Sequence, residues 1–224
     1  MASPKVRGGR GLSVRVKTAK GRKSSSTRWL KRQLNDPYVQ QAQAAGYRSR
    51  AAFKLIELDA RFHVLKKGAR VVDLGAAPGG WTQVAVERVG AKGSVVALDI
   101  QDWDDVPGAK CLTFDFMDPE ALQHLREVLG GPVDVVLSDM AASATGHNQT
   151  DHLRIVALAE AAWAFAEDVL APAGAFVCKV FQGGTETELL KVMRAKCSKV
   201  THAKPPASRK DSAEMYVIAT GFRG

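Results

Sequence analysis

A nine-residue run from Asp73 to Trp81, Asp-Leu-Gly-Ala-Ala-Pro-Gly-Gly-Trp, constrains the fold of this chain more than any other feature. It directly follows the apolar, β-branched stretch 69–72, so it predicts a strand that passes through a glycine-rich turn into a helix. Glycine tolerates positive φ and lets the backbone approach a ligand closely. Ligands of doubly wound sheets bind at the carboxyl ends of parallel strands. We therefore expect a nucleotide-like cofactor at this turn.

Acidic residues around the turn indicate which cofactor it holds. A dinucleotide site would carry Gly-x-Gly-x-x-Gly, whereas here Asp73 precedes the first glycine, where a carboxylate repels phosphate. Two further strand-like stretches end in Asp99 and Asp115, and Asp99 has about the spacing of a carboxylate that binds ribose hydroxyls. Three acids at successive strand ends suit S-adenosylmethionine, which carries an ammonium, a sulfonium, a ribose diol and an adenine amine. The alternative is an ordinary loop with helix-capping residues.

The net charge of +9 is concentrated in two segments. Residues 1–35 contain eleven Lys and Arg, residues 189–210 contain seven, and all 23 acidic residues lie outside both segments. Because phosphate contacts supply affinity rather than sequence choice, this clustering predicts a nucleic-acid partner without identifying it. The alternative for either segment is a solvated tail or helix face.

The basic segment at the start of the chain predicts a separate arm. Residues 1–28 are low in hydrophobicity, so we expect them to be disordered and to bind RNA, ahead of a single catalytic domain over residues 29–224. An Arg-rich, Ser-containing segment is also typical of a mitochondrial transit peptide. Here the apolar residues are too few for the amphipathic stripe of such a peptide.

Other residue types exclude several classes of protein. No apolar run approaches the ~20 residues of a membrane span. The three cysteines lack metal-ligand spacing and predict buried free thiols in a reducing compartment. His147 and His152 are not spaced as a pair on one helical face, so no metal site is expected.

Hydrophobic periodicity predicts alternating helices and strands along the rest of the chain. We expect helices over residues 49–62, 80–89, 118–129, 156–170 and 186–196, and strands over residues 69–72, 94–99, 110–115, 133–139, 175–181, near 200 and over 214–220. Pro172 and Gly174 are expected to separate the helix at 156–170 from the next strand. This alternation predicts an α/β fold, a mostly parallel sheet with helices on both faces.

Five motifs, taken in order, resemble the FtsJ/RlmE family of ribosomal RNA 2′-O-methyltransferases. They occupy residues 47–55, 71–81, 137–141, 179–183 and 214–221. The resemblance begins near Ser25 and continues to the end of the chain. Five motifs in order are far more specific than the glycine-rich turn alone.

The resemblance implies both a fold and a set of site residues. The fold is that of class I S-adenosylmethionine-dependent methyltransferases, a Rossmann-like seven-stranded sheet of order 3-2-1-4-5-7-6 with an antiparallel seventh strand. The implied catalytic tetrad, with Lys179 as proton acceptor, is Lys54, Asp139, Lys179 and Glu214. The predicted cofactor contacts are Asp73, Gly75, Gly79, Trp81, Asp99, Asp115 and Asp139.

The predicted strands explain how three tetrad residues meet. Asp139 ends a parallel strand, Lys179 lies late in the next one, and Glu214 opens the last strand. If that last strand is antiparallel, its start lies at the same edge as the ends of the others. A neutral hydroxyl is a poor nucleophile, so a base must remove its proton during attack. The residues alone leave Lys54 and Lys179 as candidates, and the resemblance assigns the base to Lys179.

Two positions depart from the family pattern. Ala142 stands where many members have proline after Ser-Asp-Met-Ala, which removes a restriction on φ near the acceptor ribose. Ala173 stands where Pro-Gly-Gly is usual. Neither change affects the tetrad. The loop after Asp139 also lacks the Asn/Asp-Pro-Pro-aromatic pattern of enzymes that methylate exocyclic base amines, which favours ribose over base.

The resemblance also implies a substrate. Family members of this length methylate a uridine ribose in the A-loop of 23S rRNA within the large ribosomal subunit, and we expect a cytoplasmic monomer with that activity. Methylation of tRNA or of mitochondrial large-subunit rRNA is the alternative within the family. A noncatalytic RNA-binding assembly factor would have little reason to retain the complete tetrad. A small-molecule methyltransferase would leave the two basic segments unexplained.

Overall fold

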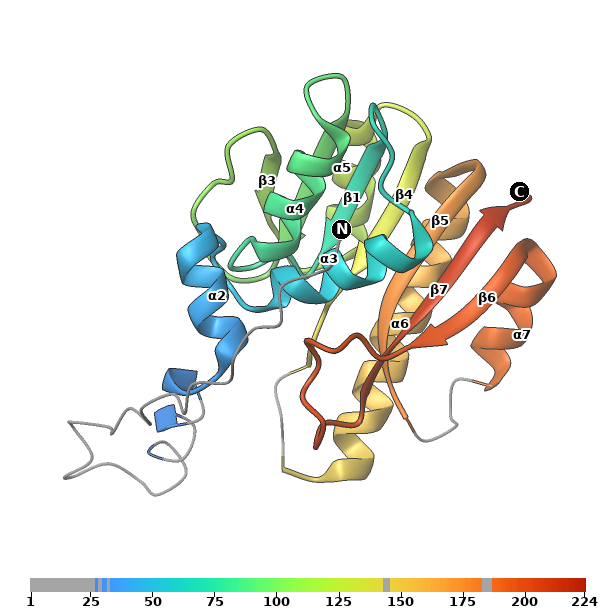
Figure 1. Cartoon of the computed structure of the whole chain (residues 1–224). Coiled ribbons are helices and arrows are strands. Elements are labelled where there is room, and N and C mark those ends of the chain that lie inside the picture. The colour runs from blue at the N-terminus through green and yellow to red at the C-terminus, as the bar shows by residue number, and fades with distance from the viewer. Residues whose placement is uncertain (1–26, 28–29, 32, 143–145, 183–186) are drawn as a thin grey trace, which may run out of the picture.

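The computed structural model describes residues 27, 30–31, 33–142, 146–182 and 187–224, so nearly all of the predicted arm lies outside the described residues. Its seven-stranded sheet has the order β3-β2-β1-β4-β5-β7-β6 (Figure 1). The strands are β1 (Arg70–Leu74), β2 (Ser94–Asp99), β3 (Lys110–Thr113), β4 (Val133–Ser138), β5 (Leu170–Phe181), β6 (Cys197–Ala203) and β7 (Glu214–Phe222). The helices are α2 (Pro37–Ala45), α3 (Ala51–Phe62), α4 (Gly80–Val89), α5 (Pro119–Leu129), α6 (Asn148–Val169) and α7 (Thr187–Lys196).

The strand directions confirm the predicted fold class. Strands β1 to β5 pair in parallel, and β7 pairs antiparallel with both β5 and β6. The order and the antiparallel seventh strand are those that the resemblance implied.

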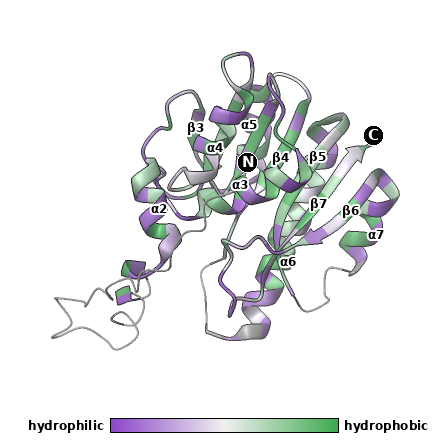
Figure 2. Ribbon diagram, viewed as in Figure 1, coloured by the Kyte–Doolittle hydropathy of each residue, from purple (hydrophilic) through white to green (hydrophobic). Residues whose placement is uncertain are grey.

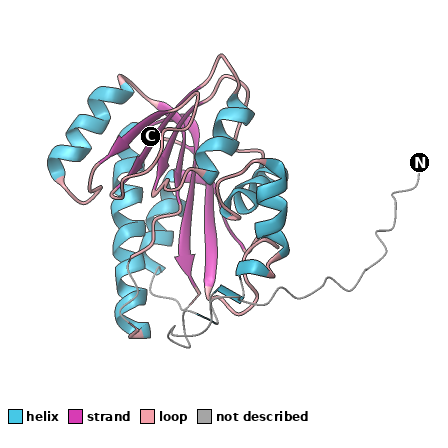
Figure 3. Cartoon of the chain, turned by 90° about the vertical axis from the view of Figure 1, so that its left-hand side faces the viewer, coloured by secondary structure: helices cyan, strands magenta, loops and turns pink. Residues whose placement is uncertain are grey.

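Helices cover both faces of the sheet (Figure 3). Side chains alternate along a strand, so Val71 packs with α3 and α4 in one apolar cluster while Val72 packs with α5, α6 and α7 in the other. The central strands are therefore apolar on both faces, as the colouring of Figure 2 shows. This double burial explains why their sequences are continuous hydrophobic runs.

The boundary between α6 and β5 differs from the prediction. Helix α6 begins at Asn148, before the predicted start at residue 156. Hydrophobic periodicity did not detect its first turns, because they are polar and carry no apolar stripe. Strand β5 begins at Leu170, so Pro172 and Gly174 lie within the strand. A register shift opposite Val133–Val135 accommodates these extra residues. Ala173 there has a φ of 66°, the left-handed region in which glycine has no steric penalty.

Two smaller differences concern α2 and β3. Helix α2 was not predicted, although Asp36 caps it by accepting from the Tyr38 amide at 3.0 Å and Pro37 stands at its first turn. Strand β3 ends at Thr113, so Asp115 lies in the loop that follows it. Asp118 caps α5, as predicted, by accepting from the Glu120 amide at 2.9 Å.

The sheet brings the predicted catalytic residues to one edge. Asp139 directly follows β4, and the antiparallel pairing of β5 with β7 sets Lys179 opposite Tyr216 and Phe181 opposite Glu214. The carboxyl ends of the parallel strands and the start of β7 therefore meet, as the strand pattern predicted.

Three further findings concern the described part of the chain. No helix in it is long and apolar enough to cross a membrane. It contains no cluster of three or more His, Cys, Asp or Glu that could hold a metal ion. Cys178 and Cys197 are buried free thiols, and Cys111 is a partly buried one.

Candidate active site

The glycine-rich turn connects β1 to α4. Gly75 has a φ of 75°, and its amide donates to the carbonyl of Leu98 in β2 at 2.9 Å. A Cβ at Gly75 would lie 2.7 Å from the Met140 backbone, and a Cβ at Gly79, where φ is 109°, would lie 2.7 Å from Val106. Both the space and the left-handed backbone therefore require glycine at these two positions.

A cavity of about 470 Å³ opens beside this turn. Three of the predicted carboxylates, Asp99, Asp115 and Asp139, line it together with Gly75. Its volume falls in the range of roughly 300–1,000 Å³ that small-molecule sites usually have. The cavity is thus lined by residues from four neighbouring strand ends. They are Gly75 directly after β1, Asp99 at the end of β2, and Asp115 and Asp139 after β3 and β4.

The lining of the cavity fits S-adenosylmethionine. The two carboxylate oxygens of Asp99 accept from the amides of Ala77 and Gln101, each at 2.9 Å. These bonds orient the carboxylate and leave lone pairs for a ribose diol. Asp115 is held by the Met117 amide at 2.9 Å.

Large apolar side chains complete the lining. Three of them are between 41 and 63% exposed, namely Ile100, Phe114 and Met117. Exposed apolar side chains that cluster in a cavity mark a ligand-binding surface. An adenine ring would cover this one.

Two predicted cofactor contacts lie beneath the cavity rather than in its lining. Asp73 is fully buried; one of its oxygens accepts from the Thr82 hydroxyl at 2.7 Å, and the other has no hydrogen-bond partner among the described residues. Trp81 is also buried, and its Nε1 donates to the Ala51 carbonyl at 2.8 Å. A direct contact of either side chain with the cofactor stays a prediction. Gly79, which was also predicted to contact the cofactor, is not among the residues that line the cavity.

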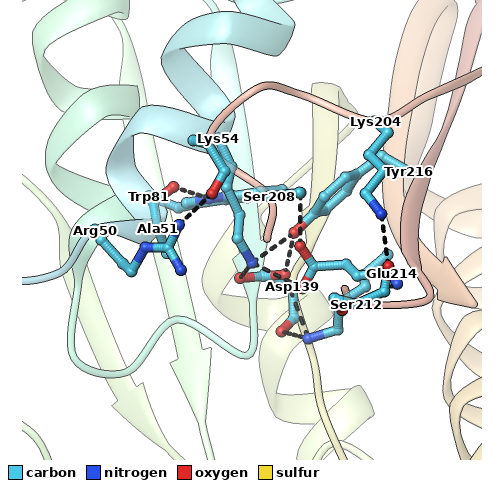
Figure 4. A network of polar contacts seen from close by, with 12 residues as sticks. Arg50, Ala51, Lys54, Trp81, Asp139, Lys204, Ser208, Ser212, Glu214 and Tyr216 are labelled. Atoms are coloured by element: carbon cyan, nitrogen blue, oxygen red, sulfur yellow. Dashed lines mark hydrogen bonds and ion pairs between the residues drawn. The ribbon is translucent and has the colours of Figure 1, made fainter. Parts of the chain in front are cut away.

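Next to the cavity lies a network of charged side chains, here called the active-site network, formed by Lys54, Asp139, Lys179, Glu214 and Tyr216. Figure 4 shows Lys54 of α3 directed towards Glu214 and Tyr216 of β7. Lys54 Nζ donates to Glu214 Oε2 at 2.8 Å and to Tyr216 Oη at 3.1 Å. It also lies 3.9 Å from Asp139 Oδ2.

Asp139 links this network to the cavity. Lys179 Nζ donates to the Asp139 main-chain carbonyl at 2.7 Å and lies 3.3 Å from Asp139 Oδ1. The same Oδ1 accepts from the Tyr216 hydroxyl at 2.7 Å. Because Asp139 also lines the cavity, one residue contacts both the cofactor space and the two lysines. The structure thus brings all four predicted tetrad residues together.

The charges in the network set the protonation state of Asp139. Burial works to raise the pKa of this carboxyl group, but the ammonium groups of Lys179 and Lys54 outweigh burial. The hydrogen bond from Tyr216 adds to their effect. The pKa of Asp139 therefore lies below its usual value, and the carboxylate is charged at neutral pH.

Tyr216 is the member of the network that sequence analysis did not single out. It is fully buried, and its ring packs against Trp81 with centroids 5.5 Å apart. Burial, followed by the charges of Asp139 and Glu214, raises the pKa of Tyr216 well above its usual value, so the hydroxyl remains a donor. Strand alternation was the available signal, because it puts positions 214 and 216 on the same face of β7.

We expect Asp73→Asn to change how the stability of the protein depends on pH. Burial raises the pKa of Asp73 to about 7, against the effect of the hydrogen bond from Thr82. An unfolded aspartate titrates near ~3.9, so the folded chain holds this proton more tightly. The contribution of this proton to the free energy of unfolding is fully present below the unfolded pKa of ~3.9. It is lost as the pH rises towards 7, at about 1.4 kcal/mol per pH unit. The variant lacks the titration.

Urea unfolding of both proteins between pH 4.5 and pH 8 checks this expectation. The free energy of unfolding of Asp73→Asn should rise relative to that of the wild type by a few kcal/mol across the range. Parallel curves would mean that Asp73 is ionised in the folded protein throughout.

The sheet order, the glycine-rich turn and a carboxylate-lined cavity beside a lysine–carboxylate network define a class I S-adenosylmethionine-dependent methyltransferase. The family model described as FtsJ-like methyltransferase matches residues 47–222. The chain belongs to this family, and its cofactor is S-adenosylmethionine.

Two bacterial relatives are similar over nearly their whole length. A Rhodospirillum rubrum protein named Ribosomal RNA large subunit methyltransferase E is 66% identical over 232 residues, covering 100% of this chain and 88% of the relative. A Paramagnetospirillum magneticum protein of the same name is 64% identical over 222 residues, covering 97% and 91%. The crystal structure of a Plasmodium falciparum protein described as a ribosomal RNA methyltransferase has a TM-score of 0.72 at 28% identity, covering 80% of this chain and 100% of that one.

Proposed function

We propose that this methyltransferase acts on the 2′-hydroxyl of a uridine ribose in the A-loop of 23S rRNA, within the large ribosomal subunit. The observation that carries the proposal is the active-site network beside the cofactor cavity, because it supplies a base and two ribose-binding groups. The names of the relatives at 64 and 66% identity support large-subunit rRNA as the substrate. The proposal includes a cytoplasmic monomer as the working form.

The cofactor would be held by the groups that line the cavity. S-adenosylmethionine supplies an electrophilic methyl group when bound. Asp99 would accept from its ribose hydroxyls, Asp115 would accept from its adenine amine, and the charged Asp139 would face its cationic end. Trp81 stands in the first turn of α4, where main-chain N–H groups lack helical partners and suit a carboxylate, and Gly79 is the residue that precedes the helix.

In the proposed reaction, Lys179 is the general base. The Lys179 ammonium group would first lose a proton, because only the neutral amine has a lone pair. That amine would then accept the 2′-hydroxyl proton while the methyl group passes from the cofactor sulfur to the ribose oxygen, so the O–H and S–C bonds break as the N–H and O–C bonds form. The Asp139 carbonyl, which accepts from Lys179 at 2.7 Å, fixes the position of its nitrogen. A positioned general base contributes about 10²- to 10⁴-fold to a rate.

Lys54 and Glu214 are proposed to position the acceptor ribose. Their 2.8 Å ion pair presents one donor and one acceptor at the sheet edge where the hydroxyl must enter. The two side chains are only 12 and 14% exposed, so an incoming ribose would meet them already oriented. Preorganised polar groups of this kind lower the cost of ordering the transition state.

The end of the second basic segment lies beside this entrance. It forms most of the loop before Glu214, and the exposed Lys204 and Lys210 of this loop can contact phosphates, whereas Lys199 pairs with Thr220 towards the far end of β7. RNA is recognised largely through its shape, its phosphates and its 2′-hydroxyls, which suits an enzyme whose target atom is a 2′-hydroxyl.

The test of the proposed function is transfer of a labelled methyl group from S-adenosylmethionine to purified large subunits, small subunits and bulk tRNA, followed by identification of the labelled nucleoside. Label in a 2′-O-methyluridine of the large subunit, mapped to the A-loop, is the expected result. Label confined to tRNA would keep the chemistry and replace the substrate. Binding of RNA and cofactor without any transfer would contradict the proposal in favour of a noncatalytic assembly factor.

Deleting residues 1–24 is expected to weaken RNA binding and to flatten its salt dependence. This segment contains eight Lys and Arg. Each phosphate contact that is lost makes the slope of log affinity against log salt concentration shallower by about 0.7 to 0.9. Binding of the full chain and the truncated chain to large subunits at several salt concentrations measures the two slopes, with the melting temperature as the control for folding. Equal slopes would show that the segment makes no phosphate contacts.

A further inference from the structure

The loop between β6 and β7, residues 204–213, carries buried contacts that the proposed reaction does not use. In Figure 1 this orange-red loop lies beside α3 at the edge of the sheet. At its centre, the Ala207 amide donates to Glu57 Oε2 at 2.7 Å, and the Ala207 carbonyl accepts from the Arg50 guanidinium. The main-chain N–H and C=O of Ala207 are therefore both bonded to side chains of α3 or of the residue that precedes it.

The next residue, Ser208, contacts the active-site network. It is 5% exposed, and its hydroxyl donates to Glu214 Oε1 at 2.8 Å. The other oxygen of the same carboxylate, Oε2, accepts from Lys54 at 2.8 Å. Figure 4 shows Ser208 and Lys54 reaching the Glu214 side chain from different elements. Each oxygen of the Glu214 carboxylate thus accepts from a different side chain.

We propose that Ser208 is a positioning residue that orients Glu214 for the acceptor ribose, an inference that rests on the proposed function of this site. A glutamate side chain has three rotatable bonds. The Lys54 side chain is also flexible and can move with the Glu214 carboxylate, so Lys54 by itself does not fix the orientation of the carboxylate. Ser208 follows Ala207, which Glu57 and Arg50 hold in place, so its hydroxyl fixes the plane of the Glu214 carboxylate. Hydrogen bonds to charged groups are strong enough to hold such an orientation.

The Glu57 contact that holds Ala207 comes from the same helix as Lys54. Glu57 stands one helical turn after Lys54 on α3, and positions three apart lie on the same side of a helix. The Tyr38 hydroxyl holds Glu57 by donating to its Oε1 at 2.9 Å. Helix α3 therefore fixes both the lysine that contacts Glu214 Oε2 and the loop that delivers Ser208 to Oε1.

The experiment is steady-state methyl transfer to large ribosomal subunits by Ser208→Ala, Ser208→Thr and the matched control Ser212→Ala. Ser212 lies in the same loop, but its hydroxyl accepts from the Glu214 main-chain amide at 3.1 Å and does not contact the carboxylate. We expect Ser208→Ala to lower kcat about tenfold while the KM for S-adenosylmethionine stays near that of the wild type. Ser208→Thr keeps the hydroxyl and should keep most of kcat, and Ser212→Ala should lose much less than Ser208→Ala.

A double-mutant cycle separates positioning from a general loss of structure. In a Glu214→Ala background, adding Ser208→Ala should cost nothing further in kcat, because the carboxylate that it orients is gone. An equal loss in both backgrounds, full activity of Ser208→Ala, or a Ser208→Thr variant as slow as Ser208→Ala would overturn the inference. A wild type that methylates no large subunits contradicts the proposed function, and the inference with it, whereas an active wild type with an equally active Ser208→Ala overturns the inference alone.

Discussion

Lys179→Ala is expected to lower methyl transfer by at least about 10³-fold, within the range for loss of a general base. Lys179 is 7% exposed and its nitrogen lies 2.7 Å from the Asp139 carbonyl oxygen, so alanine removes the proposed base from a buried, fixed position. Affinity for S-adenosylmethionine should stay nearly unchanged, since Lys179 does not line the cavity. Asp139 keeps Lys54 as a partner, so the fold should be retained.

Single-turnover methylation of large subunits and calorimetric titration with S-adenosylmethionine measure these two quantities. Lys92→Ala is the matched control, because Lys92 is an exposed lysine in the turn between α4 and β2, outside both basic segments. Lys54→Ala should retain more activity than Lys179→Ala if Lys54 only positions the ribose. Near-wild-type turnover of Lys179→Ala, or a larger loss in Lys54→Ala, would reject Lys179 as the base.

Asp139→Asn is expected to lower methyl transfer more than any variant except Lys179→Ala, and it should also lower the free energy of unfolding. The carboxylate neutralises two ammonium groups in a largely buried site, with Lys179 3.3 Å away and Lys54 3.9 Å away. Removing one partner of such a buried group typically costs about 3 kcal/mol or more. Transfer should fall at least about a hundredfold, because the lysines and the cofactor lose the negative charge that they share.

The pH dependence of unfolding provides a specific test of this role. Burial opposes ionisation of Asp139, but the two lysines hold its pKa below the usual value. A lowered pKa stabilises the folded state above the unfolded value of ~3.9, and that stability is lost as the pH falls through the folded pKa. The stability gap between wild type and Asp139→Asn should therefore be present at pH 7 and close on acidification.

Asp118→Asn makes the same chemical change at a site where little should happen. Asp118 caps α5 on the surface, and asparagine caps helices about as well as aspartate. The control should match the wild type in urea unfolding at pH 7 and in methyl transfer. An Asp139→Asn protein as stable as this control would mean that the carboxylate does not stabilise the two lysines.

Local sequence determined much of this protein. The apolar runs at 70–74, 94–99 and 133–138 became strands because burial on both faces of a parallel sheet demands continuous hydrophobicity. The turn between β1 and α4 was also predictable, since Gly75 and Gly79 have a backbone conformation and surroundings that only glycine tolerates. The order of the strands came from the family resemblance rather than from periodicity, because periodicity does not report which strands are neighbours.

Only the tertiary structure decided how the site is assembled. Lys54 and Glu214 are 160 positions apart, and no local pattern states that they lie 2.8 Å from each other. Tyr216 and Ser208 read as a buried strand residue and a loop residue until the antiparallel pairing of β7 and the contacts of its preceding loop put both hydroxyls on network carboxylates. Propensity and periodicity act over a few residues, whereas hydrogen bonds between distant segments depend on how the whole sheet and its helices pack.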